Sequence, residues 1–112
     1  MRVSKIAAAG LLGFFLTQPA HAAGSIEPQA LKALFPGNFE ALVHGYSVTF
    51  TANKDGSLVG RHAFATDSGR WSIKRGRLCI MLSSWLNGRT ACSQVVHHGA
   101  WYRANDVLFR KP

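Results

Sequence analysis

The sequence predicts a mainly β protein: a small antiparallel meander barrel, or a strongly curved sheet, with six or seven strands, one short N-terminal helix and one disulfide. Apolar and polar residues alternate over short segments, most clearly at residues 46–52. Polar turn sequences recur about every eight to twelve residues, as in antiparallel all-β folds. No segment is long enough for the crossover that parallel strands require. A closed barrel is favoured because closure removes exposed edge strands; an open sheet packed on the helix is the alternative.

The N-terminus has the features of a secretory signal peptide. Arg2 and Lys5 precede an apolar run at residues 6–16, and Ala20-His21-Ala22 supplies small residues at the positions a signal peptidase reads. The run is shorter than the roughly 20 apolar residues of a membrane-spanning helix. We therefore expect cleavage after Ala22 and a periplasmic or secreted protein with no transmembrane segment after processing.

Processing would leave a single β domain, residues 23–112, of 90 residues (112 minus 22). A domain this short buries only about 60–65% of its unfolded surface, so its core is small. In an exported chain, Cys79 and Cys92 indicate a disulfide rather than a redox or metal pair, and two free buried thiols are the alternative. The bond would close a loop of about 14 residues and stabilise the fold by about 3 kcal/mol.

One helix is expected, within residues 23–36. Pro28 suits the first turn of a helix, where its missing N–H leaves no hydrogen bond unmade. An apolar stripe with helical spacing follows, formed by Ala30, Leu31, Leu34 and Phe35. Pro36-Gly37 then ends the helix. The stripe is brief, so the helix is expected to cover one end of the barrel or sheet.

The strands follow the helix. They are expected at residues 46–52, 58–65, 70–74, 78–82, 89–97, 101–103 and 107–110. The turns are expected at residues 53–56, 66–69, 75–76, 83–88, 98–99 and 105–106. If residues 83–88 close a simple hairpin, residues whose numbers sum to 171 face each other, and 79 + 92 meets that condition. The two cysteines would then be directly opposed.

Several motifs resemble a family of short exported proteobacterial proteins. The matching segments are Leu31-Lys32-Ala33-Leu34-Phe35-Pro36-Gly37, Asp55-Gly56-Ser57-Leu58-Val59-Gly60, Gly69-Arg70-Trp71-Ser72-Ile73, Gly76-Arg77-Leu78-Cys79 and Gly88-Arg89-Thr90-Ala91-Cys92. The resemblance extends over most of the mature chain, and its motifs consist of turn and core residues. The family is a domain of unknown function. The resemblance therefore implies an exported β domain with one disulfide and transfers no catalytic residue.

No catalytic or metal-binding arrangement is recognisable, so we expect neither enzymatic activity nor a cofactor. His97 and His98 are neighbours in a predicted strand and would point to opposite faces, so we do not expect them to share a metal ion. For a metal site, His44 or His62 would have to join one of them. The tight ligand motifs of zinc sites are missing from the sequence, as are the serine motifs G-x-S-x-G and S-x-x-K. Three of the five carboxylates lie in predicted turns and Glu27 lies at a helix start, so none suggests an acid–base pair.

The charge suggests a binding surface. Without Arg2 and Lys5 the chain keeps eleven of its thirteen Lys and Arg against five acids, a formal charge of +6. A basic strand face is predicted from Arg70, Lys74, Arg75 and Arg77. Such a face could bind anionic envelope polymers, lipopolysaccharide or wall glycan; a merely solubilising surface is the alternative. Nucleic acid is not expected as the partner of an exported protein.

A loop suggests a second kind of partner. Trp85 and Leu86 lie at a predicted loop tip, followed by Arg89, and tip aromatics beside arginine are typical interface anchors. The loop would serve a protein-binding accessory, either an envelope-complex subunit or a hydrolase inhibitor; alternatively, its apolar residues fold back over the barrel mouth. A third hypothesis, a barrel that carries a small apolar ligand, requires a cavity, and about 90 residues leave little room for one. The sequence does not define an oligomeric state.

Overall fold

The computed structural model describes residues 24–112, which form one helix and nine strands. The predicted signal peptide and its cleavage point lie outside the described residues. The elements in order are α1 (Pro28–Leu34), β2 (Gly37–Val43), β3 (Tyr46–Ala52), β4 (Ser57–His62), β5 (Ala65–Lys74), β6 (Arg77–Leu82), β7 (Thr90–Ser93), β8 (Val95–His98), β9 (Trp101–Ala104) and β10 (Val107–Arg110). Within this range no helix is both long and apolar enough to cross a membrane.

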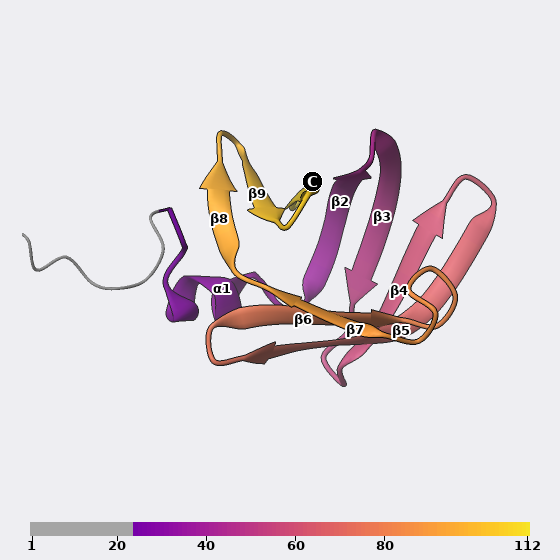
Figure 1. Ribbon diagram of the computed structural model, residues 1–112, viewed down its shortest axis with the longest axis horizontal. Helices are drawn as coiled ribbons and strands as arrows, with labels where there is room; N and C mark the ends of the chain where they lie inside the picture. Colours follow the sequence, from indigo (N-terminus) through magenta and orange to yellow (C-terminus); the bar gives the residue numbers. More distant parts are fainter. Residues whose placement is uncertain (1–23) are drawn as a thin grey trace, which may run out of the picture.

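All nine strands belong to one antiparallel sheet that is nearly closed. Their order is β7-β6-β5-β4-β3-β2-β10-β9-β8, so β10 pairs with β2 from the other end of the domain. The two strands at the ends of this order, β7 and β8, are separated in the chain only by Gln94. Figure 1 shows β7 running into β8, so one bent segment follows both edges of the sheet. The expected mainly β, antiparallel fold is thus confirmed in the form of a nearly closed, barrel-like sheet.

The strand number differs from the expected six or seven. The additional strand is β2, whose residues Phe39, Ala41 and Val43 face inward, and the expected strand 89–97 is divided by the bend at Gln94. The turn expected at residues 66–69 was wrong. The chain turns earlier, at Ala63-Phe64, because His62 pairs with Ala65. Polar turn-forming residues therefore lie inside a long strand, β5.

The helix covers one end of the barrel, which we call the closed end. Leu31 of α1 is fully buried (0% exposed) and packs with the buried residues of the strands. Phe35 follows the helix and stacks against Phe39 of β2 and Trp71 of β5, with ring centroids 4.7 Å and 5.0 Å apart. Figure 1 shows α1 beside the start of β2. Two further connections, residues 53–56 and 75–76, lie at this same end, because alternate turns of a meander share an end.

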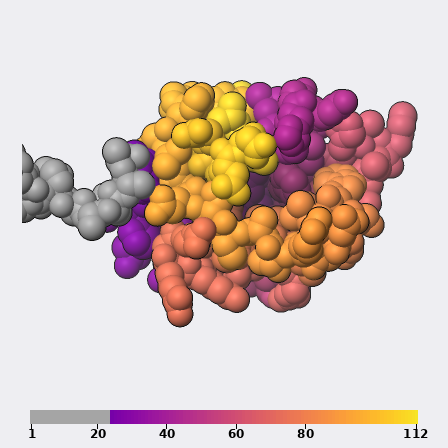
Figure 2. Space-filling view, in the orientation of Figure 1, coloured from indigo at the N-terminus to yellow at the C-terminus, as the bar shows by residue number. Residues whose placement is uncertain are grey.

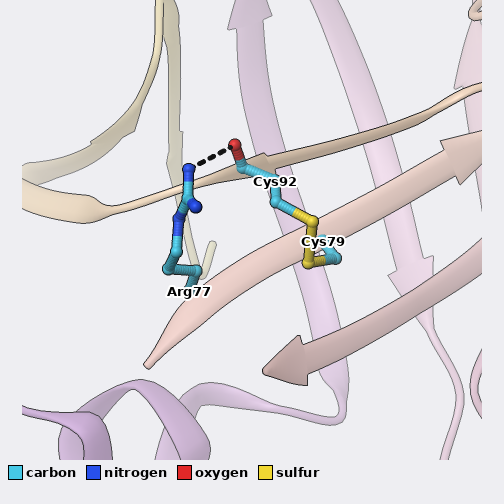
Figure 3. Close-up of a disulfide and its surroundings, with 3 residues drawn as sticks. All are labelled: Arg77, Cys79 and Cys92. Atoms are coloured by element: carbon cyan, nitrogen blue, oxygen red, sulfur yellow. Dashed lines mark hydrogen bonds between the residues drawn. A yellow bond between two sulfur atoms is a disulfide. The ribbon is translucent and has the colours of Figure 1, made fainter. Parts of the chain in front are cut away.

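The predicted disulfide is present and joins directly opposed residues. Cys79 of β6 and Cys92 of β7 are register partners, as the hairpin numbering required, and their sulfur atoms are bonded. Arg77 reaches across the same pair of strands, where its Nη2 donates a hydrogen bond to the carbonyl oxygen of Cys92 at 3.2 Å (Figure 3). The β6–β7 hairpin is therefore held by a covalent bond and a side-chain hydrogen bond.

Candidate functional site: an apolar cavity in the barrel

The interior of the barrel contains a cavity of about 900 Å³. Its lining is mostly apolar and comes from nearly every strand. The apolar lining residues are Phe35, Phe39, Ala41, Val43, Val48, Phe50, Leu58, Ala65, Leu78, Ile80, Leu82, Trp85, Leu86, Ala91, Ala104, Val107 and Phe109. In Figure 2 a hollow is visible between the yellow C-terminal residues and the orange residues that follow β6. The volume falls within the roughly 300–1,000 Å³ typical of ligand sites.

Small side chains on inward-facing strand positions create this space. Ala41 of β2, Ala91 of β7 and Ala104 of β9 all line the cavity where larger residues would fill it. Ala91 is exposed although it faces inward, which shows that the space beside it is free. A small barrel can either fill with side chains or hold one small ligand. The expectation that a domain of this length leaves little room was therefore wrong.

The cavity opens at the end opposite α1, where the polar lining residues gather. This mouth is formed by His44, Tyr46, His62, Trp85, Asn105 and Asp106. His44 Nε2 lies 3.7 Å from Asp106 Oδ2, which links the β2–β3 turn to the β9–β10 turn. His62 Nδ1 lies at hydrogen-bond distance, 2.9 Å, from the carbonyl oxygen of Ser47, and its ring meets that of Tyr46 edge-on at 5.3 Å. The mouth is thus polar and the interior apolar.

Trp85 lies over part of the mouth. Its ring packs edge-on against Phe50, with centroids 6.4 Å apart, and above Gly60 of β4. A Cβ at Gly60 would lie 2.6 Å from Trp85 and 2.9 Å from Phe50, so only glycine leaves room for both rings. Leu86 is half-buried against the core. The β6–β7 loop therefore folds back over the cavity.

The carboxylate of Asp67 holds this loop in place. Asp67 lies on β5 and is only 5% exposed. It accepts hydrogen bonds from the backbone N–H groups of Trp85 at 2.8 Å, Ser84 at 3.0 Å and Ser68 at 3.0 Å. These hydrogen bonds, that from Trp85 foremost, hold the pKa of Asp67 below its ordinary value. The lid loop is thus attached to the barrel wall by a buried anion.

Sequence reasoning missed the role of Asp67 because the residue was assigned to a turn. A signal was available in the alternation of the strand. Along β5, every second residue faces inward: Gly69, Trp71 and Ile73 do so. Asp67 lies two residues before Gly69 and therefore also faces inward. A lone acid in an inward series indicates a carboxylate with buried partners, since buried charges are normally hydrogen-bonded. The partners themselves lie 17 and 18 residues away and could not be identified locally.

The residues of the predicted basic face lie on the outer surface towards the closed end. Lys74 of β5 and Arg77 of β6 are register partners, and Arg75 lies in the turn between them. Arg70 lies further along β5 and donates a hydrogen bond from Nη2 to the carbonyl oxygen of Asp55 at 3.0 Å. The structure thus brings three of the four basic residues together and ties the fourth to the β3–β4 turn.

The predicted partner loop lies at the other end of the barrel. Trp85 remains 37% exposed, whereas Leu86 is turned inward. Arg89 is exposed on the same loop, and its backbone N–H donates to the carbonyl oxygen of Leu86 at 2.9 Å. The basic face and the partner loop are therefore separate surfaces.

Residues 24–112 contain no group of three or more His, Cys, Asp or Glu side chains placed to hold a metal ion. His97 and His98 are neighbours on β8, and the ring of His97 stacks on Tyr102 at 5.4 Å. Comparison with protein-family models, curated proteins and solved structures found no match to this chain.

Proposed function

We propose that this domain binds a small apolar or amphipathic molecule inside the barrel. The observation that supports this proposal is the open, apolar cavity of about 900 Å³. A domain of this size gains stability from a filled core, so small residues at inward positions that leave the core hollow favour a binding role. With the disulfide and the signal-like N-terminus, we place this binding protein in the periplasm or outside the cell.

The polarity of the lining defines the chemical class of the ligand. Among the described residues that line the cavity, Ser93 is the only polar side chain away from the mouth, and its Oγ donates to the carbonyl oxygen of Gln94 at 2.8 Å. A charged or strongly hydrogen-bonding group inside the cavity would therefore lose its hydration without replacement. The ligand would keep its apolar part inside and any polar group near His44, His62 and Asp106.

The test is binding of N-phenyl-1-naphthylamine, a neutral apolar probe that becomes fluorescent away from water. Ala91→Phe places a ring in free space within the cavity and should lower probe affinity at least tenfold, because a filled site cannot accept the probe. Thr90→Phe is the matched control, since Thr90 is the neighbouring residue on the outer face of β7. Unfolding curves establish that both variants fold. Equal affinity in the two variants, or no binding by the native protein, would refute the proposal.

Two other functions remain proposals with narrower support. The cluster of Lys74, Arg75 and Arg77 favours binding of an anionic envelope polymer, and that binding should weaken steeply with salt. The exposed part of Trp85, with Arg89, favours a protein-binding accessory, either a complex subunit or a hydrolase inhibitor. For the latter, Trp85→Ala should abolish a complex recovered from envelope extracts without unfolding the domain. Polymer binding that does not depend on salt would contradict the first of these proposals. A complex that is unchanged in Trp85→Ala would contradict the second.

A further inference from the structure

The exposed large hydrophobic side chains of the described residues all lie at one end of the barrel. They are Tyr46, 62% exposed, Phe64, which is fully exposed, and Trp85, 37% exposed. Tyr46 follows the β2–β3 turn, Phe64 lies in the β4–β5 turn and Trp85 lies in the β6–β7 loop. Alternate turns of a meander share an end, so these three residues surround the mouth of the cavity. We call them the aromatic rim.

Phe64 serves no packing role within the domain. It occupies the second position of a two-residue turn, after Ala63, which has a φ of 53°. Such turns favour Gly, Asn or Asp, which are polar or conformationally free, whereas this chain has Ala-Phe. A fully exposed phenylalanine leaves a large apolar surface in water. The turn therefore presents an apolar tip that no other residue of the described range, 24–112, covers.

The charge near the rim is mainly positive. Arg61 precedes the β4–β5 turn and Arg89 ends the β6–β7 loop, and both are exposed. Of the two acids at this end, Asp106 lies beside His44 and Asp67 is buried under the lid loop. Near the rim, two exposed arginines thus outnumber one exposed carboxylate, that of Asp106. The surface around the aromatic rim is therefore complementary to an anionic one.

We infer that the aromatic rim docks on the surface of an anionic lipid bilayer, with Phe64 and Trp85 at the level of the headgroups. Aromatic residues favour that interface, and neighbouring arginines contribute electrostatic attraction to anionic lipids. Docking in this orientation would place the cavity mouth against the bilayer. The cavity ligand would then be a lipid or its acyl chain, taken up without crossing water. The identity of the ligand rests on the proposed function, whereas the docking does not.

The shape of the rim favours a bilayer over a protein partner. The three aromatic residues lie on separate loop tips around an opening, and the mouth between them is lined by polar residues. A stable protein interface needs a continuous patch of about 800 Å² on each partner. A fluid bilayer can accommodate separate loop tips. Because the rim surrounds the opening of the apolar cavity, an acyl chain of the bilayer could enter the cavity directly.

The test is flotation of the protein with vesicles of phosphatidylcholine and phosphatidylglycerol, mixed 3:1, compared with pure phosphatidylcholine. Phe64→Ser should lower partitioning into anionic vesicles about tenfold or more, because the variant no longer buries a phenylalanine side chain in the bilayer. Arg61→Gln and Arg89→Gln should each lower it about fivefold. Lys54→Gln is the matched control, since Lys54 lies in the β3–β4 turn at the closed end, and it should change partitioning less than twofold.

The outcomes separate this inference from the proposed function. Absence of binding to anionic vesicles, an equal loss in the Lys54 variant, or a Phe64-dependent dimer in light scattering would overturn the docking. Probe binding without vesicle binding overturns the docking alone. Vesicle binding by a native protein that takes up no probe would refute the cavity ligand alone. The Ala91→Phe variant should float with vesicles as the native protein does.

Discussion

The two ends of the barrel are built from the same strands but packed in opposite ways. At the closed end, Leu31 of α1 is fully buried and Phe35 stacks between Phe39 and Trp71. At the mouth, small residues such as Ala104 face inward, and the loop that carries Trp85 covers part of the opening. The alternation along the strands is the same at both ends. Side-chain volume and a covering helix make the difference.

This difference separates stability from binding. A packed end supplies most of the apolar burial that holds a small domain together. A hollow end gives up part of that burial and keeps space and mobility for a ligand, as binding sites commonly do. Substitutions at the packed end should therefore act mainly on stability, and substitutions at the mouth mainly on ligand exchange.

Leu31→Ala should have the largest effect on stability. Removing a fully buried leucine leaves a cavity that the surrounding strands cannot fill, and we expect a loss of about 4 kcal/mol in the free energy of unfolding. Leu86→Ala at the mouth should cost only about 1 kcal/mol, because Leu86 is half-buried beside an existing cavity. Urea denaturation of both variants measures the difference. Equal losses would mean that the ends do not differ in packing.

Replacing both cysteines by serine should cost about 3 kcal/mol, because the bond closes a loop that includes the whole β6–β7 connection. Chemical reduction of the native protein should give the same loss, which excludes an effect of the serines. Thermal unfolding with and without reductant measures it. A loss below about 1 kcal/mol would show that the hairpin is held by the sheet and Arg77 alone.

Trp85→Ala should affect exchange of the ligand more than stability. Among the described residues, the Trp85 ring makes one aromatic contact, with Phe50, so we expect a loss of about 1 kcal/mol in the free energy of unfolding. Loss of the cover should release the probe severalfold faster in stopped-flow measurements. Trp85→Phe keeps an aromatic ring over Gly60, so its release rate should lie between those of the native protein and Trp85→Ala. An unchanged release rate would show that Trp85 does not cover the opening.

Acidification should loosen the lid loop. The pKa of Asp67 lies below its ordinary value of 3.8 in the folded state, chiefly because of the N–H of Trp85. The contribution of ionised Asp67 to the free energy of unfolding is therefore fully present above about pH 4. It is lost as the pH falls through the folded-state pKa. Asp67→Asn should be less stable at pH 7, because an amide NH₂ would face N–H donors. It should also lose less stability than the native protein below pH 4.

Asp55 provides the comparison for this pH effect. Its pKa is also lowered, first by the hydroxyl of Ser57, but it caps its own turn at the closed end. Asp55→Asn should therefore reduce the acid sensitivity of thermal unfolding and leave probe release unchanged. Asp67→Asn should reduce the acid sensitivity and also accelerate probe release. Identical probe release rates in the two variants would show that Asp67 does not hold the lid loop in place.

The sequence determined the local features of this protein. Alternation of period two identified most strands, including residues 46–52, and Pro28 and the apolar stripe after it identified the helix. The hairpin numbering paired Cys79 with Cys92 correctly, because a hairpin register follows from its turn. All of these signals depend on residues within about a dozen positions of each other.

Only the tertiary structure decided closure, the cavity and the lid. Closure depends on the pairing of Val107 with Val43, and the shared edge segment depends on the bend at Gln94. The cavity volume depends on the width of the barrel and on which residues of distant strands face one another. Likewise, Asp67 became an anchor because a loop 17 residues later reached it. Period-two alternation says which side chains point inward, but only their summed volume against the enclosed space decides whether a core is full.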